Sequence, residues 1–316
     1  MTRLLRGLLK NIRRPDTKKN KRRIVKWMQR CGILKRKMNC AKCNRRMKLM
    51  KCDRNDGLRW VCKHHKSNPL SVRNGSIFTK SHTPLAKWLE FMLRFSQGLQ
   101  LKQLTMISEG IAASSKTLTR MTTILRKVCM AAVVRLRKRG MKIGGRHRFV
   151  VIDESKFAHK RKYHRGRCGK TWHRKRQWVF GMLEVDENSR KPILKLVKDR
   201  SRQTLTRQIR RHIRPRTSIL TDEWRAYRGQ LSQYGYHQYS VCHKKNFVDP
   251  VTGAHTQHIE RAWQNYKLEI WRHRGNRTPE TLQSHLKMIE WHHWLGVCHY
   301  NGVLGRIFHD VKQYLK

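Results

Sequence analysis

The chain has 316 residues, and its 74 Lys and Arg against 19 Asp and Glu give a formal net charge of +55. A hydrophobic content of 38% with ten tryptophans can fill a core, which excludes a disordered tail. Self-repulsion at this charge would destabilise a compact state unless a polyanion neutralises it, so the composition predicts a nucleic-acid partner. No apolar run reaches the length of about 18 residues that spans a bilayer, and we therefore expect no membrane partner.

The N-terminal segment, residues 1–38, is dominated by lysine and arginine, with few large apolar side chains. Its composition predicts a solvated basic arm, which can hold phosphates or act as a nuclear import signal. The first ten residues are too short and too often interrupted by basic side chains to form a secretory signal. We therefore expect a reducing compartment, where the nine cysteines are thiols or metal ligands before they are disulfides.

Residues 39–80 carry a pattern typical of a zinc ribbon. A C-x2-C pair and a C-x2-H pair, 18 residues apart, are formed by Cys40, Cys43, Cys62 and His65. This spacing suits two knuckles that hold one tetrahedral Zn2+ ion, with His64 as an adjacent competitor and Cys52 as an unassigned thiol. The alternative is a set of ordinary buried cysteines, but so short and polar a segment lacks the apolar residues to fold without a metal.

The next segment, residues 81–145, has helical periodicity. Apolar residues recur at i, i+3, i+4 and i+7 from Trp88 to Phe95, a short helix follows, and a turn with Gly110 leads into a long helix. This order is typical of a DNA-binding helix-turn-helix unit, and the alternative is a plain helical bundle with a charged exposed face. In the first interpretation, the recognition helix presents Ser114, Ser115, Lys116, Thr119 and Arg120.

From residue 146 to residue 316, strands and helices alternate, and we expect this part to form a domain of its own. Strands are predicted over residues 149–152, 177–185, 193–197, 217–221 and 236–241. Helices are predicted over residues 202–213, 223–231, 256–272 and 279–295. Three strands, a helix, a strand, a helix, a strand and a closing helix is the order of an RNase H-like fold, of the α/β class with a mixed five-stranded sheet.

Three acids stand at the ends of elements in this predicted order. The first and fourth strands would be neighbours, so Asp153 and Asp222, 69 positions apart, would face each other, and the closing helix would bring Glu260 to the same place. Three carboxylates would repel one another unless divalent cations neutralise them, and two such ions about 4 Å apart suit in-line attack on a phosphodiester. Alternation along a strand turns Glu154 and Glu223 to the opposite face, where we expect salt-bridging or capping residues.

Four blocks of sequence carry a resemblance to a known family: residues 151–157 (VIDESKF), 178–181 (WVFG), 221–227 (TDEWRAY) and 255–263 (HTQHIERAW). In this order they resemble the DDE transposases of the Merlin type, which have an ISXO2-like transposase domain and bacterial insertion-sequence relatives. The front half is similar too, through the ribbon and the stretch RNGSIF at residues 73–78. The resemblance covers roughly residues 38 to 300, although family members close the ribbon with a cysteine where this chain has His65.

The resemblance implies a cut-and-paste transposase that uses Mg2+ or Mn2+, with Asp153, Asp222 and Glu260 as its metal-binding triad. It also implies a homo-oligomer, a dimer or larger, because two DNA ends must be held together. In a eukaryotic host it implies a nuclear location.

We expect the front modules to bind the terminal inverted repeats of double-stranded transposon ends, and the RNase H-like domain to cleave DNA and join it to target DNA. The flanking phosphates would be held by Lys156, Arg225, Arg261 and Lys267. Two alternatives stay open: a catalytically silent, transposase-derived DNA-binding regulator, and a DNA nuclease selective for branched structures.

Overall fold

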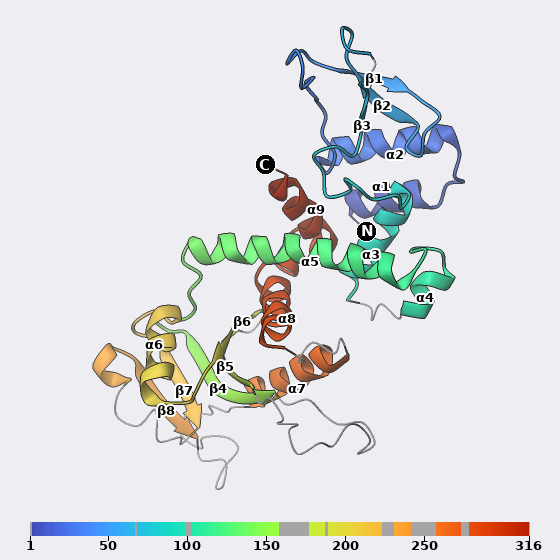
Figure 1. Ribbon diagram of the computed structural model, residues 1–316. Coiled ribbons are helices and arrows are strands. Elements are labelled where there is room, and N and C mark those ends of the chain that lie inside the picture. Colours follow the sequence, from blue (N-terminus) through green and yellow to red (C-terminus); the bar gives the residue numbers. More distant parts are fainter. Residues whose placement is uncertain are drawn as a thin grey trace, which may run out of the picture. The chain divides into compact units, whose positions relative to one another are not determined.

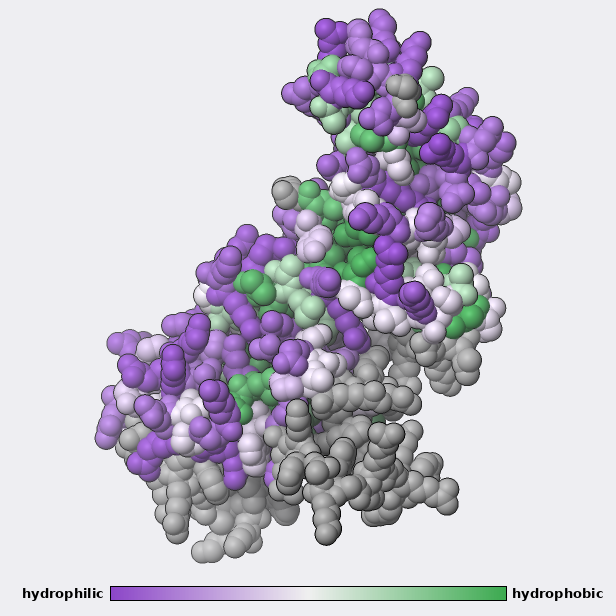
Figure 2. Space-filling view, viewed as in Figure 1, coloured by the Kyte–Doolittle hydropathy of each residue, from purple (hydrophilic) through white to green (hydrophobic). Residues whose placement is uncertain are grey.

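The chain forms two compact units, residues 1–132 with 295–316 and residues 133–294 (Figure 1). The computed structural model describes residues 2–66, 68–98, 103–157, 177–186, 189–222, 231–241, 257–272 and 278–315. Within these ranges, no helix combines the length and the hydropathy that a membrane crossing requires. Hydrophilic side chains cover most of the surface that Figure 2 shows, as the charge of +55 leads one to expect.

The first unit is mainly helical. Its helices are α1 (Arg3–Ile12), α2 (Lys18–Cys31), α3 (Leu85–Ser96), α4 (Gln103–Ser108) and α9 (Gly302–Tyr314), and α5 (Ser115–Lys138) contains the boundary between the units. The helix, short helix, turn and long helix predicted for residues 81–145 correspond to α3, α4 and α5. Gly110, in the turn before α5, has a φ of 64°, a left-handed conformation that glycine adopts without strain.

The N-terminal segment is folded, which corrects the expectation of a solvated arm. Thr2 and Thr17 cap α1 and α2 by accepting hydrogen bonds from the backbone amides of the third residue after each. Leu8, Val25 and Met28 are fully buried, and α1 and α2 both pack on α3. The high density of Lys and Arg hides an amphipathic pattern, because one apolar residue per turn is enough to anchor a helix to a core.

The ribbon is a small antiparallel sheet in the first unit. Its strands, in the order β1-β2-β3, are β1 (Lys48–Lys51), β2 (Leu58–Val61) and β3 (Leu70–Ser71). A buried ion pair fastens it to the next segment, since Arg73 binds both carboxylate oxygens of Asp56 at 2.6 and 2.7 Å. The remaining guanidinium nitrogen, Nη1, donates to the carbonyl oxygens of Ser81 and Thr83. Each guanidinium nitrogen of this buried arginine thus donates to a fixed acceptor.

The second unit contains the predicted mixed five-stranded sheet, with the order β6-β5-β4-β7-β8. Its strands are β4 (Phe149–Phe157), β5 (Gln177–Asp186), β6 (Ser189–Val197), β7 (Ser218–Asp222) and β8 (His237–Val241). The first three form an antiparallel meander, and β7 and β8 run parallel to β4. The other elements are α6 (Arg202–His212), the 3-10 turn η1 (Ser232–Tyr234), α7 (Gln257–Arg272), α8 (Pro279–Trp291) and the π-helical turn η2 (His292–Gly296).

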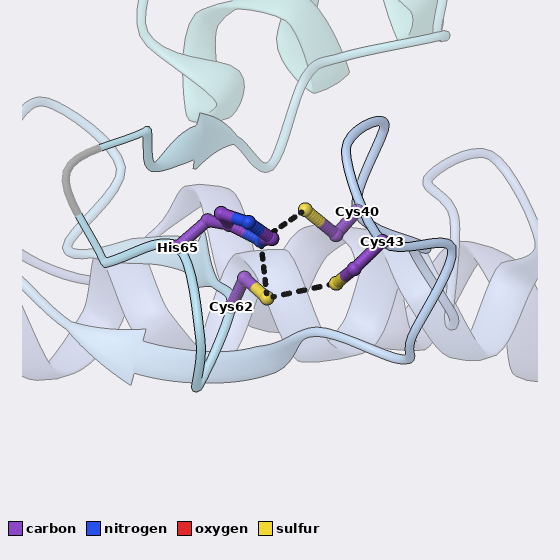
Figure 3. Close-up of side chains that lie close together, drawn as sticks. All are labelled: Cys40, Cys43, Cys62 and His65. Carbon is purple, nitrogen blue, oxygen red and sulfur yellow. Dashed lines mark hydrogen bonds between the residues drawn. The ribbon is translucent and has the colours of Figure 1, made fainter.

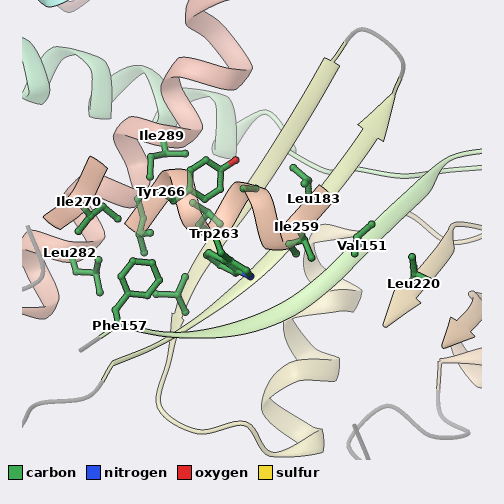
Figure 4. Close-up of a cluster of buried hydrophobic side chains, with 14 residues drawn as sticks. Val151, Phe157, Leu183, Leu220, Ile259, Trp263, Tyr266, Ile270, Leu282 and Ile289 are labelled. Carbon is green, nitrogen blue, oxygen red and sulfur yellow. The ribbon is translucent and has the colours of Figure 1, made fainter. Parts of the chain in front are cut away.

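The sheet separates two cores. Val150 and Ile152 of β4 face a core that contains residues of α6, whereas Val151 and Phe157 face a core with residues of α7 and α8 (Figure 4). Successive residues of a strand point to opposite faces, so odd-numbered positions of β4 lie under α7. This alternation decides which acids of β4 can belong to a site beneath α7.

Both boundaries of the second unit differ from the expected residues 146 and 316, because this unit runs from residue 133 to residue 294. The C-terminal residues 295–316 group with the first unit, although we expected them in the sheet domain. The buried side chains of α9 pack on α3, and Trp27 of α2 meets Phe308 edge-on at 5.8 Å. An amphipathic helix does not reveal in its own sequence which core it will join. The predicted helix over residues 223–231 falls almost entirely on residues 223–230, which lie outside the described ones.

Candidate functional site

Asp153 lies in the middle of β4, on the face that α7 covers. It is half-buried, and its Oδ2 accepts a hydrogen bond from Nε1 of Trp263 at 2.9 Å. Its Oδ1 accepts from the backbone amide of Glu154 at 2.8 Å. Residue 154 belongs to the other face, because its cross-strand partner Phe180 is part of the core on the α6 side. The strand continues past residue 152, where we expected it to end, so Asp153 is held by ladder pairing with β5.

Asp222 is the last residue of β7, the parallel neighbour of β4. The pairing of the two strands joins Val151 to Leu220, an offset of 69 positions, which is also the separation of Asp153 and Asp222. Residue 222 therefore lies level with residue 153 at the end where the parallel pairing of these strands stops. The side chain of Asp222 is outside the described part of the chain, as is its neighbour Glu223.

Glu260 lies in the first turn of α7 and is exposed. Ile259 and Trp263 anchor this turn in the core, and α7 packs on β4 and β5. Glu260 precedes Trp263 by three residues, so it lies on the same side of the helix about 4.5 Å further along the axis. Since Trp263 contacts Asp153, Glu260 lies within one helical turn of the residue that contacts this acid.

Gly181 makes the close docking of α7 possible. It is the cross-strand partner of Asp153, and a Cβ at this position would lie 2.4 Å from Cζ2 of Trp263. The indole therefore lies directly on the backbone of β5, where its N–H reaches the carboxylate of Asp153. Phe157 and Tyr266 hold the ring edge-on at 6.0 and 6.1 Å. Neither Trp263 nor Gly181 has a role that the sequence alone predicts, although both are in the blocks that carry the family resemblance.

The predicted phosphate-binding cations have different environments. Lys267 lies one turn after Trp263, and its Nζ is 5.7 Å from the centre of the Phe157 ring. Burial lowers the pKa of Lys267, and the negative charge of Asp153 acts against that shift. Arg261 is exposed on α7, and Arg225 lies outside the described residues.

Lys156 is not brought together with Asp153. Its position on β4 belongs to the opposite face, and its Nζ lies 5.2 Å from the ring centre of Trp178. Arg200 stacks on the same ring with its Cζ at 4.1 Å. The two cations therefore share one aromatic face away from the acids, and a phosphate contact of Lys156 would have to lie on that side.

The predicted recognition residues lie at the start of α5 and are exposed: Ser114, Ser115, Lys116, Thr119 and Arg120. The hydroxyl of Ser114 accepts a hydrogen bond from the amide of Thr117 at 3.2 Å, which caps the helix. Leu118 and Met121 face inward, so the polar residues form the solvent side of the first turns. The DNA-binding role of these residues stays a prediction.

The four predicted zinc ligands converge in the ribbon (Figure 3). The ligand atoms of Cys40, Cys43, Cys62 and His65 all lie within 4.8 Å of one another. Individual separations are 3.6 Å from Cys40 Sγ to His65 Nδ1, 3.6 Å between the sulfurs of Cys43 and Cys62, and 3.8 Å from Cys62 Sγ to His65 Nδ1. Tetrahedral zinc with Zn–S bonds of about 2.3 Å separates its ligands by about 3.8 Å, so the set fits this ion.

The neighbours of the cluster distinguish the ligands from the competitors. His64 is exposed, and its Nε2 lies 2.6 Å from Nη1 of Arg45, away from the thiols. Cys52 is not part of the group. Burial raises the pKa of the Cys62 thiol. Hydrogen bonds from the backbone amides of His64 and His65, from the side chain of His65 and from Cys43 lower it by more, which gives a pKa of about 6. A thiol that ionises near neutral pH is suited to bind a metal.

One protein-family model matches most of the second unit. Residues 142–293 match the model of a family described as the ISXO2-like transposase domain. Most of the second unit is thus similar to the ISXO2-like transposase domain. This confirms the predicted family resemblance, and the matched segment includes Asp153, Asp222 and Glu260.

Two solved structures show a more distant likeness to this chain. An intasome of simian T-cell lymphotropic virus, in complex with the PP2A regulatory subunit B56 gamma, matches at 16% identity and a TM-score of 0.31, over 61% of this chain and 64% of that one. A pre-cleavage Mos1 transpososome matches at 11% identity and a TM-score of 0.28, over 71% and 75%. This chain thus spans less than two thirds of the intasome protein. No curated protein sequence matches it.

Proposed function

We propose that this protein is a DNA transposase that cleaves and joins DNA strands with Mg2+ or Mn2+. The observation that carries the proposal is the placement of Asp153 within the matched transposase domain. This acid lies on a central strand, beneath the helix that carries Glu260, and level with Asp222 on the next strand. Two-metal phosphoryl transfer requires carboxylates that converge on one place, and this arrangement would bring the three acids together.

The acids fit divalent cations by their donor chemistry. Carboxylate oxygens are the ligands that Mg2+ and Mn2+ prefer, and alternation assigns position 222 to the face of Leu220, which lies in the core with Val151. The hydrogen bonds from Trp263 and from the amide of Glu154 hold the carboxylate of Asp153, a group of the kind that these cations bind. When bound, the cations would lower the pKa of the attacking water or 3′-hydroxyl and stabilise the leaving oxygen.

The residues of the chain would orient the reactants around that centre. Trp263 fixes the carboxylate of Asp153, so one metal ligand is oriented before the substrate arrives. Arg261 is exposed on the same helix and would hold a flanking phosphate, and Lys267 would add positive charge near Asp153. No covalent bond between protein and DNA is needed for this chemistry.

The first unit supplies DNA binding in this proposal. Zn2+ held by Cys40, Cys43, Cys62 and His65 would keep the ribbon folded, and the start of α5 would contact the terminal repeats. Two ends have to be held together, so we also propose a dimer or larger assembly and, in a eukaryotic host, a nuclear location. Light scattering of the protein with paired end DNA tests the assembly.

The triad is tested by neutral isosteres. Asp153→Asn and Glu260→Gln should each lower Mg2+-dependent cleavage of end-containing DNA by on the order of a thousandfold or more, while DNA affinity is retained. Glu154→Gln, on the opposite face of β4, and Glu269→Gln, further along α7, are matched controls that should stay active. The assay is incubation of purified protein with labelled end DNA, with and without Mg2+, followed by resolution of cut and joined strands.

The same assay separates the alternatives. An Asp153→Asn protein that cuts and joins ends as the unaltered chain does would show that the triad is misassigned. If the unaltered protein binds end DNA but makes no Mg2+-dependent cut, the chain is a DNA-binding regulator. Cleavage of branched DNA in preference to element ends would identify a structure-selective nuclease.

A further inference from the structure

The solvent side of α2 consists of cations. Lys19, Arg23, Lys26 and Arg30 are all exposed, and their spacing of i, i+4, i+7 and i+11 places them on one stripe. The stripe is about 16 Å long, because a helix rises 1.5 Å per residue. The other side of the helix is buried through residues such as Met28, so the stripe has a fixed direction. We call these four residues the α2 stripe.

Two hollows in the surface of the first unit adjoin the α2 stripe. One, of about 660 Å3, is lined by the stripe and by Arg22, Gln29 and Arg36. The other, of about 1170 Å3, has a wall of α1 and its following residues, with cations contributed by Arg3, Arg6, Lys10 and Arg14. Arg23 and Arg30 line both hollows, so the stripe separates them as a ridge. The described lining of the two hollows contains no carboxylate.

Two of the flanking guanidinium groups are held rigidly by backbone carbonyls. Arg36 donates to the carbonyl oxygens of Gln29 and Arg30 at 2.7 and 2.5 Å, and Arg22 donates to that of Gly57 at 3.2 Å. Such groups lose little further rotamer freedom when they bind an anion. They are therefore prepared for phosphate contacts in a way that freely rotating lysines are not.

The two acids close to α2 form ion pairs with lysines of this helix that are not part of the α2 stripe. Lys18 pairs with Asp53 at 2.8 Å and Lys21 with Asp16 at 3.4 Å, which leaves these carboxylates on the sides of the helix. Within the described residues, no member of the α2 stripe has a carboxylate partner. A row of exposed charges at this density repels itself unless a polyanion covers it.

We propose that the α2 stripe docks on double-stranded DNA through its phosphates, without reading base sequence. The B-DNA major groove is about 12 Å wide and admits an α-helix, and the two cationic hollows would then face the backbones on either side of the ridge. The stripe carries only Lys and Arg, whose contacts to phosphates are independent of sequence. This surface would hold flanking or target DNA. The choice of DNA as the polyanion rests on the proposed transposase function, whereas the cationic surface itself does not.

The test removes three charges from the stripe of the full-length protein. Arg23→Gln, Lys26→Gln and Arg30→Gln are combined, and the control combines Lys138→Gln, Arg139→Gln and Lys142→Gln, which are exposed cations outside the stripe. Binding of a random 30-base-pair duplex is followed by fluorescence anisotropy over a series of NaCl concentrations. The slope of log affinity against log salt should become shallower by about 2 to 3 in the stripe variant, at about 0.9 per lost phosphate contact, and should change by less than about 1 in the control.

A second variant keeps the test independent of folding. Arg23→Lys with Arg30→Lys retains the charges, so it should keep the slope of the unaltered chain, and circular dichroism verifies helicity in all variants. Equal slopes in the stripe variant and the control would overturn the proposal. Failure of the unaltered protein to bind any duplex would overturn the proposed function together with the α2 stripe, whereas equal slopes with retained binding would overturn the stripe alone, so the two failures are distinguishable.

Discussion

Three residues from distant parts of the chain determine the position of the central carboxylate. Asp153 is predictable from sequence, because an acid after an apolar strand in so basic a chain is conspicuous. Trp263 and Gly181 are not, because their roles depend on α7 lying on β5, and no local pattern states which strand a helix will cover. A glycine inside a strand often indicates that another group packs closely on the backbone there. This signal marks position 181, but it does not predict that Trp263 is the group that packs on it.

Removing the indole N–H tests whether Trp263 orients Asp153. Trp263→Phe keeps an aromatic ring over Gly181 but deletes the hydrogen bond to Oδ2, so the carboxylate can rotate away from the metal geometry. We expect Mn2+ affinity, measured by calorimetry, and single-turnover cleavage to fall by roughly 10- to 100-fold, as is usual when the partner of a metal ligand is lost. Trp178→Phe, on the opposite face of the sheet, is the matched control. Unchanged Mn2+ affinity in Trp263→Phe would show that the hydrogen bond is only structural.

At the level of elements, the ribbon and the N-terminal helices differ in how well sequence predicts them. The spacing of Cys40, Cys43, Cys62 and His65 identifies the ligand set, because metal geometry restricts which spacings work. The choice between the two neighbouring histidines needs the structure, in which His64 meets Arg45 instead. The helices α1 and α2 could not be recognised from composition, since their Lys and Arg content outweighs the apolar residues that anchor them.

Metal removal tests the ribbon as an element. Its strands have four, four and two residues, and the buried cluster between them is small, so zinc ligation should supply most of its stability. We expect one Zn2+ per chain, and Cys62→Ser should lose the metal and make residues 39–71 sensitive to protease while the five-stranded sheet stays folded. Cys52→Ser is the control and should keep its zinc, as a colorimetric zinc assay would show. Full zinc content in Cys62→Ser would contradict the ligand set.

The whole molecule combines a predictable sheet with an unpredictable grouping of elements. The order of the strands in the sheet, and the position of residue 222 beside residue 153, follow from the order of strands and helices along the chain. In this connectivity the parallel strand β7 must lie beside β4. The assignment of α9 to the first unit does not follow, because several cores offer a surface for one amphipathic helix. The π-helical turn at residues 292–296 also interrupts the single helix predicted over residues 279–295, and it occurs where the chain passes between the units.

The charge distribution has a consequence for the stability of the whole chain. Buried acids are paired with arginines, as in Glu290 with Arg137 at 2.5 Å and Asp310 with Arg306 at 2.9 Å. Burial raises the pKa of Glu290, and the guanidinium of Arg137 opposes this. Few acids are left to neutralise the surface, so repulsion among exposed cations acts on both units.

Salt should therefore stabilise this protein. Raising NaCl from about 50 to about 500 mM shortens the Debye length from about 14 to about 4 Å and screens the exposed charges, while the buried pairs are little affected. Each 1 kcal/mol of repulsion that salt relieves raises the midpoint temperature of unfolding by about 2–4 °C in a domain of this size, and scanning fluorimetry measures this temperature.

A duplex DNA added at low salt should also raise the midpoint temperature, because a ligand that binds only the folded state stabilises that state by mass action. The variant with three glutamines in the α2 stripe should gain less from both additions, and a midpoint that falls with salt would mean that surface ion pairs outweigh repulsion.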